Sequence, residues 1–301
     1  MRTLLSDVLA GGRVLILDGA MGTEMQRRGV DVGLPLWSAN ALMTAPETVL
    51  AIHREYLAAG AEIITANTFR TTRRTFRNAG RVDRSEELTA LAVWLARRAR
   101  DEAGGSALVA GSIAPLEDCY RPDLVPPDAE LAEEHAELAI RLALAGVDLI
   151  LVETMNTVRE AAAACRATTA TGLETVVSFL CRPDGRLSSG ESLEEGVAAL
   201  IPLRPAGLSL NCIPPRFVGP ILARLRTLTT LPLAAYANVG RPGGEQAGVP
   251  MRIDVDEESY ARFAAEWIRE GAVIVGGCCG TTPSYIRALR EELPQTHRGT
   301  E

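Results

Sequence analysis

The residues best suited to chemistry in this chain are cysteines that follow predicted strands. Cys278 and Cys279 come directly after two glycines that end the apolar run 272–275, a pattern typical of a buried strand followed by a sharp turn. Cys212 stands just beyond a second apolar run, 207–210. Two adjacent thiols can form a vicinal disulfide, fill a core without reacting, or bind one soft metal ion. The strands and loops that position the cysteines decide among these three alternatives.

Eight short apolar runs alternate with segments of helical periodicity. The runs are continuous rather than interrupted by polar residues, as expected for parallel strands that helices cover on the outside. The predicted strands are 14–17, 62–66, 107–110, 147–152, 174–179, 207–210, 231–236 and 272–275, and the predicted helices are 45–59, 85–102, 130–145, 158–169, 193–200, 217–228, 257–270 and 284–292. Eight such units predict an α/β fold, a single (β/α)8 TIM barrel, with an open doubly wound sheet as the alternative.

The long loops and the polar residues gather at one end of the predicted barrel. Loops 21–44, 116–128 and 240–256 all follow strand ends, and barrel enzymes place their working residues at the carboxyl ends of the strands. These ends carry Asp18, Asn67, Ser112, Glu153, Cys212, Asn238, Cys278 and Cys279. We therefore expect one barrel domain over 1–293, with its site at this mouth, and a tail over 294–301.

Composition argues against several classes of protein. A net charge of −7 disfavours nucleic acid as a partner, because phosphate contacts need clustered cations. No apolar run reaches the roughly 18 residues of a membrane span, and Ser6 and Asp7 interrupt the N-terminal apolar run, unlike a secretory signal. We therefore expect a cytoplasmic protein without membrane contact. All 31 basic residues are arginine and there are three histidines, which excludes lysine Schiff-base chemistry and a multi-histidine metal site.

Three thiolates at one barrel mouth would suit a single zinc ion. The ends of strands six and eight lie about 10 Å apart in a closed barrel, given the spacing of neighbouring strands, and Zn–S bonds are about 2.3 Å long. Cys212, Cys278 and Cys279 would leave one tetrahedral position open, as in catalytic sites. Such an ion activates water poorly but holds an incoming thiol as thiolate, so we expect alkyl transfer to sulfur. The other three cysteines are expected to pack or to be incidental: Cys119, Cys165 and Cys181.

The residues at these strand ends resemble those of the homocysteine S-methyltransferase family over nearly the whole chain. The specific part is the joint presence of Asn211-Cys212 and Gly276-Gly277-Cys278-Cys279-Gly280-Thr281-Thr282. It is accompanied by Leu17-Asp18-Gly19-Ala20-Met21-Gly22-Thr23, Pro35-Leu36-Trp37-Ser38, Thr65-Ala66-Asn67-Thr68-Phe69, Gly111-Ser112-Ile113, Glu153-Thr154 and Tyr236-Ala237-Asn238. The resemblance implies that the three cysteines bind Zn²⁺, that homocysteine sulfur takes the open position, and that methyl transfer to it yields methionine.

The resemblance also implies an amino-acid pocket beside the zinc. Glu153 would accept hydrogen bonds from the homocysteine ammonium, with Asp18 nearby. The backbone amides of Gly19, Ala20 and Met21 would form a nest for its carboxylate.

Two asparagines complete the expected site. Asn238 would fill the open zinc position before substrate arrives, and with Glu153 and Asp18 it forms the expected catalytic set. Asn67 would line the substrate pocket. The alternative for Asp18 and Asn67 is that they cap loops.

The motifs of this chain point to different methyl donors. Betaine-using relatives carry tyrosines that cage a quaternary ammonium, where this chain has Arg70 and Thr154, so betaine is disfavoured. Pro35-Leu36-Trp37-Ser38 resembles stand-alone enzymes that use S-methylmethionine or S-adenosylmethionine. The alternatives are a module working with a separate methylcorrinoid protein, another thiol or selenol as acceptor, and a non-catalytic zinc-binding barrel. Small molecules are the expected partners; the oligomeric state stays open.

Overall fold

Eight parallel strands close into a barrel in the computed structural model, which describes residues 4–241 and 252–293. The strands are β1 (Leu15–Ile16), β2 (Ile63–Ala66), β3 (Leu108–Ile113), β4 (Leu149–Met155), β5 (Glu174–Phe179), β6 (Gly207–Asn211), β7 (Leu233–Ala237) and β10 (Ala272–Gly277). Their order is β1-β10-β7-β6-β5-β4-β3-β2, and a parallel bridge between Leu17 and Ile63 joins the two ends of the sheet. The predicted (β/α)8 barrel is confirmed, because an open sheet would leave those ends unpaired.

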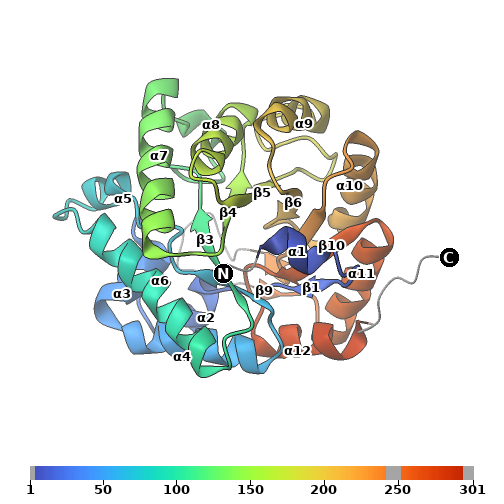
Figure 1. Ribbon diagram of the computed structural model, residues 1–301, viewed down its shortest axis with the longest axis horizontal. Helices are drawn as coiled ribbons and strands as arrows, with labels where there is room; N and C mark the ends of the chain where they lie inside the picture. Colours follow the sequence, from blue (N-terminus) through green and yellow to red (C-terminus); the bar gives the residue numbers. More distant parts are fainter. Residues whose placement is uncertain (1–3, 242–251, 294–301) are drawn as a thin grey trace.

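Helices surround the strands, as Figure 1 shows. The covering helices are α4 (Pro46–Ala58), α6 (Ser85–Glu102), α7 (Asp128–Ala145), α8 (Val158–Thr169), α9 (Leu193–Leu200), α10 (Pro215–Leu228), α11 (Glu257–Arg269) and α12 (Pro283–Glu292). Their ends follow local chemistry: Pro46 occupies the first turn of α4, and Gly146 ends α7 at φ 85°, where a side chain would be strained. No helix in the described ranges is long and apolar enough to cross a bilayer.

Several short elements lie in segments that the sequence left as loops. They are α1 (Leu5–Leu9), α2 (Gly22–Arg27), η1 (Trp37–Ala39), α3 (Asn40–Thr44), α5 (Arg73–Asn78), η2 (Pro122–Leu124), η3 (Ile201–Leu203) and the hairpin β8 (Gly240–Arg241) with β9 (Arg252–Ile253). One or two turns carry too little periodicity to be read from sequence, since tertiary contacts stabilise them. The expected tail, 294–301, and the middle of loop 240–256 lie outside the described residues.

The inside of the barrel changes from apolar to polar along β4. Leu149 and Leu151 belong to the inner apolar cluster, together with Leu5 of α1. Side chains on a strand alternate between its two faces, so Glu153 follows on the same inward face, nearer the carboxyl end. The strand period therefore directs this carboxyl group into the barrel mouth, where the loops meet.

Candidate metal centre

Three cysteines from two loops bring their sulfur atoms together at the barrel mouth. Cys212 Sγ lies 3.9 Å from Cys279 Sγ, and these two sulfurs and Cys278 Sγ all lie within 4.8 Å of one another. A tetrahedral ion with bonds of about 2.3 Å would place its sulfur ligands about 3.8 Å apart. All three cysteines are free thiols. The donor set therefore fits one soft metal ion with a fourth position left for another ligand.

The backbone of Cys212 is held in an unusual conformation directly after β6. Its φ is 60°, a left-handed conformation that costs a non-glycine residue about 1 kcal/mol or more. The Cys212 amide donates to Tyr236 O at 3.2 Å, and its carbonyl accepts from Asn238 Nδ2 at 2.9 Å. Contacts with the neighbouring strand β7 thus stabilise the turn that presents this sulfur.

Hydrogen bonds also hold Cys278 and Cys279 in place directly after β10. The Cys278 amide donates to Ala237 O at 2.9 Å, and the Cys279 amide donates to Asn238 Oδ1 at 3.0 Å. A Cβ on Gly276 would lie 2.6 Å from Leu17 Cβ, so only glycine allows β10 this close to β1. Asn238 uses both ends of its amide to join the two cysteine loops.

The three thiols share one favoured negative charge. Hydrogen bonds from Cys278 and then Cys279 hold the pKa of Cys212 well below its ordinary value. The same contacts with Cys212 raise the pKa of Cys278 and that of Cys279. A cation placed among the sulfurs would favour the thiolate forms of Cys278 and Cys279 as well, since thiolate is the form that binds metal.

Two carboxyl groups lie near these sulfurs, and neither has a basic partner among the described residues. Asp18 is 3 % exposed and accepts hydrogen bonds from Thr65 N at 2.7 Å and Thr65 Oγ1 at 2.9 Å. Burial raises the pKa of Asp18 to about 7. Burial, the nearby Asp18 and then Cys212 raise the pKa of Glu153 to about 8. No arginine of the described ranges forms an ion pair with either group, so this pocket favours a cationic ligand.

The segment after β1 is packed against the cysteine loop. The Ala20 amide donates to Thr281 Oγ1 at 3.1 Å, and Tyr56 Oη donates to Ala20 O at 2.8 Å. A Cβ on Gly19 would lie 2.7 Å from the same Thr281 oxygen. With the Ala20 amide engaged, the amides of Gly19 and Met21 are the candidates for binding a carboxylate.

Asn67 occupies the end of β2 and supports a neighbouring loop. Its Nδ2 donates to Ser38 O at 2.9 Å, and the residue is 3 % exposed. This contact is the loop-capping arrangement that the sequence left open for Asn67.

Tyr120 and Thr281 are residues whose place at the site was not expected from sequence. Tyr120 Oη lies 3.1 Å from Cys212 Sγ, and Thr281 Oγ1 donates to Cys278 O at 2.7 Å. The available signal for Tyr120 was its position in loop 116–128, which follows β3 at the same mouth. Thr281 stands in the motif that contains the cysteine pair.

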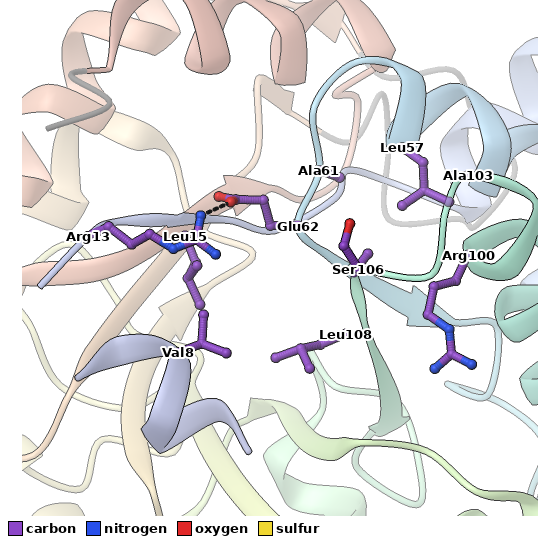
Figure 2. Close-up of a pocket in the computed structure, with 11 residues that line it drawn as sticks. Val8, Arg13, Leu15, Leu57, Ala61, Glu62, Arg100, Ala103, Ser106 and Leu108 are labelled. Atoms are coloured by element: carbon purple, nitrogen blue, oxygen red, sulfur yellow. Dashed lines mark hydrogen bonds and ion pairs between the residues drawn. The ribbon is translucent and has the colours of Figure 1, made fainter. Parts of the chain in front are cut away.

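A separate cavity of about 320 Å³ lies at the opposite, amino end of the strands (Figure 2). Its basic residues are already paired: Arg13 binds Glu62, and Arg100 binds Asp101 and Asp148. Those contacts leave little reason to expect an anionic ligand there, so the mouth with the cysteines remains the candidate site.

Comparisons with known proteins agree with this geometry. The family model described as homocysteine S-methyltransferase matches residues 15–293. Homocysteine S-methyltransferase 2 of Zea mays is 32% identical, covering 94% of this chain and 91% of its own length. A selenocysteine methyltransferase of Astragalus bisulcatus is 30% identical, covering 96% of each chain.

A solved structure shows the same barrel. The metallated form of the homocysteine methyltransferase MmuM from Escherichia coli superposes with a TM-score of 0.84 at 32% identity, covering 96% of this chain and 99% of its own. A family model spanning nearly the whole chain, with full-length relatives above 30% identity, leaves no other assignment: this chain belongs to the homocysteine S-methyltransferase family and is an enzyme of the methyltransferase class.

Proposed function

We propose that this enzyme transfers a methyl group from a sulfonium donor, S-methylmethionine or S-adenosylmethionine, to the thiol of L-homocysteine, giving methionine. The observation that carries the proposal is a three-cysteine metal site beside two carboxyl groups, Asp18 and Glu153, that lack a basic partner in the described ranges. A thiolate metal site alone could serve storage. The carboxyl pair adds a demand for a cation, which the ammonium group of an amino-acid substrate meets.

Zinc is the metal we propose, because thiolate ligands with one open position are typical of catalytic zinc. When bound, it would keep the acceptor sulfur deprotonated at neutral pH. Cys212, Cys278 and Cys279 would hold the ion. Glu153 and Asp18 would bind the acceptor's ammonium and so orient its sulfur toward the cysteines.

The other predicted residues take supporting roles in this proposal. The amides of Gly19 and Met21 would bind the acceptor carboxylate, since Thr281 already engages the Ala20 amide. Asn238 would act as a positioning residue rather than fill the open zinc position expected from the sequence, because both ends of its side-chain amide bind the backbone of the cysteine loops. Asn67 would shape the wall of the pocket through Ser38.

The residues near the mouth argue against betaine as the methyl donor. Arg70 and Thr154 stand where betaine-using relatives have tyrosines, and neither provides the aromatic face that holds a quaternary ammonium. Arg70 instead donates to Glu117 O at 2.9 Å. Thr154, at φ 59°, bonds with Asn211 through its amide and its hydroxyl. A selenol is the alternative acceptor, because selenocysteine methyltransferases are among the relatives.

A donor screen tests the proposal. Zinc-loaded enzyme and homocysteine are incubated separately with S-methylmethionine, S-adenosylmethionine, betaine and methylcobalamin, and methionine is measured by mass spectrometry. We expect methionine from a sulfonium donor and none from betaine. Cys278→Ala serves as the metal-site control and should be inactive. If methylcobalamin were the only donor that yields methionine, the corrinoid alternative would be favoured. If none of the four donors yields methionine, the proposed reaction would be contradicted.

A further inference from the structure

The hydroxyl of Tyr120 reaches the metal centre from a loop that carries none of the cysteine ligands. Its Oη lies 3.1 Å from Cys212 Sγ, a contact between residues 92 positions apart. Tyr120 is 50 % exposed, whereas Cys212 is 8 % exposed. The side chain therefore extends from solvent at the barrel mouth to a buried sulfur.

Fully buried polar residues hold this loop from the α8 side. Glu160 Oε1 accepts from the Leu116 amide at 2.8 Å, and Asn156 Nδ2 donates to Cys119 O at 2.9 Å. Both Glu160 and Asn156 have no exposed surface. Each contact offsets part of the cost of burying a carboxyl or an amide, while Glu160 Oε2 and Asn156 Oδ1 have no partner among the described residues. The two contacts hold the backbone next to Tyr120.

Two arginines hold the same loop from the α5 side. Arg70 Nη1 donates to Glu117 O at 2.9 Å, and Arg74 Nη1 pairs with Glu117 Oε1 at 3.0 Å. Asp118 Oδ1 accepts from the Tyr120 amide at 2.9 Å. A loop fastened on both sides presents Tyr120 at a fixed place, which a surface loop without a role would not need.

The direction of the Tyr120 hydrogen bond follows from the chemistry of the loaded site. A metal-bound thiolate carries no hydrogen, so the hydroxyl donates and Cys212 Sγ accepts. Hydrogen bonds to ionised acceptors are stronger than neutral ones, and partners of metal ligands tune the ligands themselves. Donation to Cys212 Sγ draws electron density from that sulfur and lowers its nucleophilicity.

We propose that Tyr120 is a positioning residue that protects Cys212 from alkylation, so that the methyl group goes to the acceptor sulfur; this inference rests on the proposed function. Productive transfer forms an S–CH₃ bond on the acceptor and breaks the donor's sulfonium S–CH₃ bond, whose electron pair stays on the donor as a neutral thioether. The same transfer to Cys212 would turn a thiolate ligand into an uncharged thioether and weaken metal binding.

The test compares wild type with Tyr120→Phe, which keeps the ring and removes only the hydroxyl. Both are loaded with zinc to equal content and treated with iodoacetamide, which forms an S–C bond and releases iodide. Peptide mass spectrometry follows each cysteine. We expect Cys212 in Tyr120→Phe to be alkylated on the order of tenfold faster, as the loss of one charged hydrogen bond implies. In the cobalt(II)-loaded variant, the sulfur-to-metal charge-transfer band should move to lower energy.

Leu124→Ala is the matched control, because Leu124 is an exposed residue of the same loop (44 %) and should leave both readouts unchanged. Equal alkylation of Cys212 in wild type and Tyr120→Phe, with an unchanged charge-transfer band, would overturn the inference. Neither readout uses homocysteine or a methyl donor. A wild type that fails the donor screen would therefore count against the proposed function, while these measurements would still decide the role of Tyr120.

Discussion

Glu153 and Asp18 are buried acids, and their burial lowers the stability of the ligand-free protein. Their pKa values, raised by burial to about 8 and about 7, mean that the folded chain holds protons that the unfolded chain releases. The unfolded groups titrate near 4.5 and 3.8. Between roughly pH 4 and pH 8 the folded state therefore binds more protons, and the contribution of these groups to the free energy of unfolding falls as pH rises.

Replacing Glu153 with glutamine should separate stability from binding. We expect ligand-free Glu153→Gln to unfold at a higher temperature than wild type at pH 8, with the difference shrinking toward pH 4, where both side chains are neutral. We also expect the wild-type KM for homocysteine to fall between pH 6 and pH 8, as the carboxylates form that bind the ammonium. The variant should have a high KM with little of this pH dependence.

Thermal unfolding and initial rates across this pH range check both expectations. The exposed Glu133 offers a control, since Glu133→Gln should change neither quantity. Should Glu153→Gln lose stability at pH 8 and keep the wild-type KM, the carboxyl would have neither a desolvation cost nor a part in substrate binding.

Hydrogen bonds from two side chains to backbone atoms connect the ends of β6, β7 and β10. Tyr260 Oη of α11 donates to Gly276 O at 2.7 Å and accepts from the Ala237 amide at 3.0 Å, so the ends of β7 and β10 share one buried hydroxyl. Asn238, one residue beyond β7, continues this connection to both cysteine loops. The spacing of the sulfurs thus depends on residues other than the three cysteines.

Asn238→Ala should weaken the metal site without removing a ligand. Because it frees Cys212 O and the Cys279 amide, we expect zinc affinity to fall by 10- to 100-fold, roughly the effect of losing an outer partner of a metal site. Competition with a chromogenic chelator measures the affinity. Asn67→Ala is the matched control, since Asn67 also donates to a backbone carbonyl at the mouth, that of Ser38, but contacts no cysteine loop. Equal affinities in the two variants would show that Asn238 does not support the site.

Metal binding should stabilise the barrel as a whole. The three sulfurs come from the loops after β6 and β10, which lie on either side of β7 in the sheet. A ligand that binds only the folded state stabilises it by RT ln(1 + [L]/Kd), about 2.7 kcal/mol at one hundred times Kd.

Zinc should therefore raise the melting temperature of wild type and leave that of Cys278→Ala unchanged. Cys165→Ala is the control: Cys165 is a fully buried thiol of α8, so this variant should be less stable yet keep the zinc-induced increase. Differential scanning fluorimetry with and without zinc measures the change. A zinc response retained in Cys278→Ala would place the bound ion elsewhere on the molecule.

The barrel and the position of its mouth could be predicted from local patterns. Continuous apolar runs and helical periodicity are properties of neighbouring residues, so they define strands and helices before any tertiary contact forms. Strand ends then place Cys212, Cys278 and Cys279 at one edge, because parallel strands end on the same side. The eight predicted units are confirmed, and the three sulfurs do meet.

Tertiary contacts alone decided the finer arrangement. Three features involve partners distant in sequence, and no periodicity encodes them. They are the left-handed backbone of Cys212, the two hydrogen bonds of the Asn238 amide, and the contact of the Tyr120 hydroxyl with a sulfur 92 positions away. The pKa values of Asp18 and Glu153 likewise arise from burial and mutual proximity. Residue types and their local order specify the barrel and bring three thiols to its mouth, whereas hydrogen bonds between loops, formed only after the barrel closes, set the charge and reactivity of that mouth.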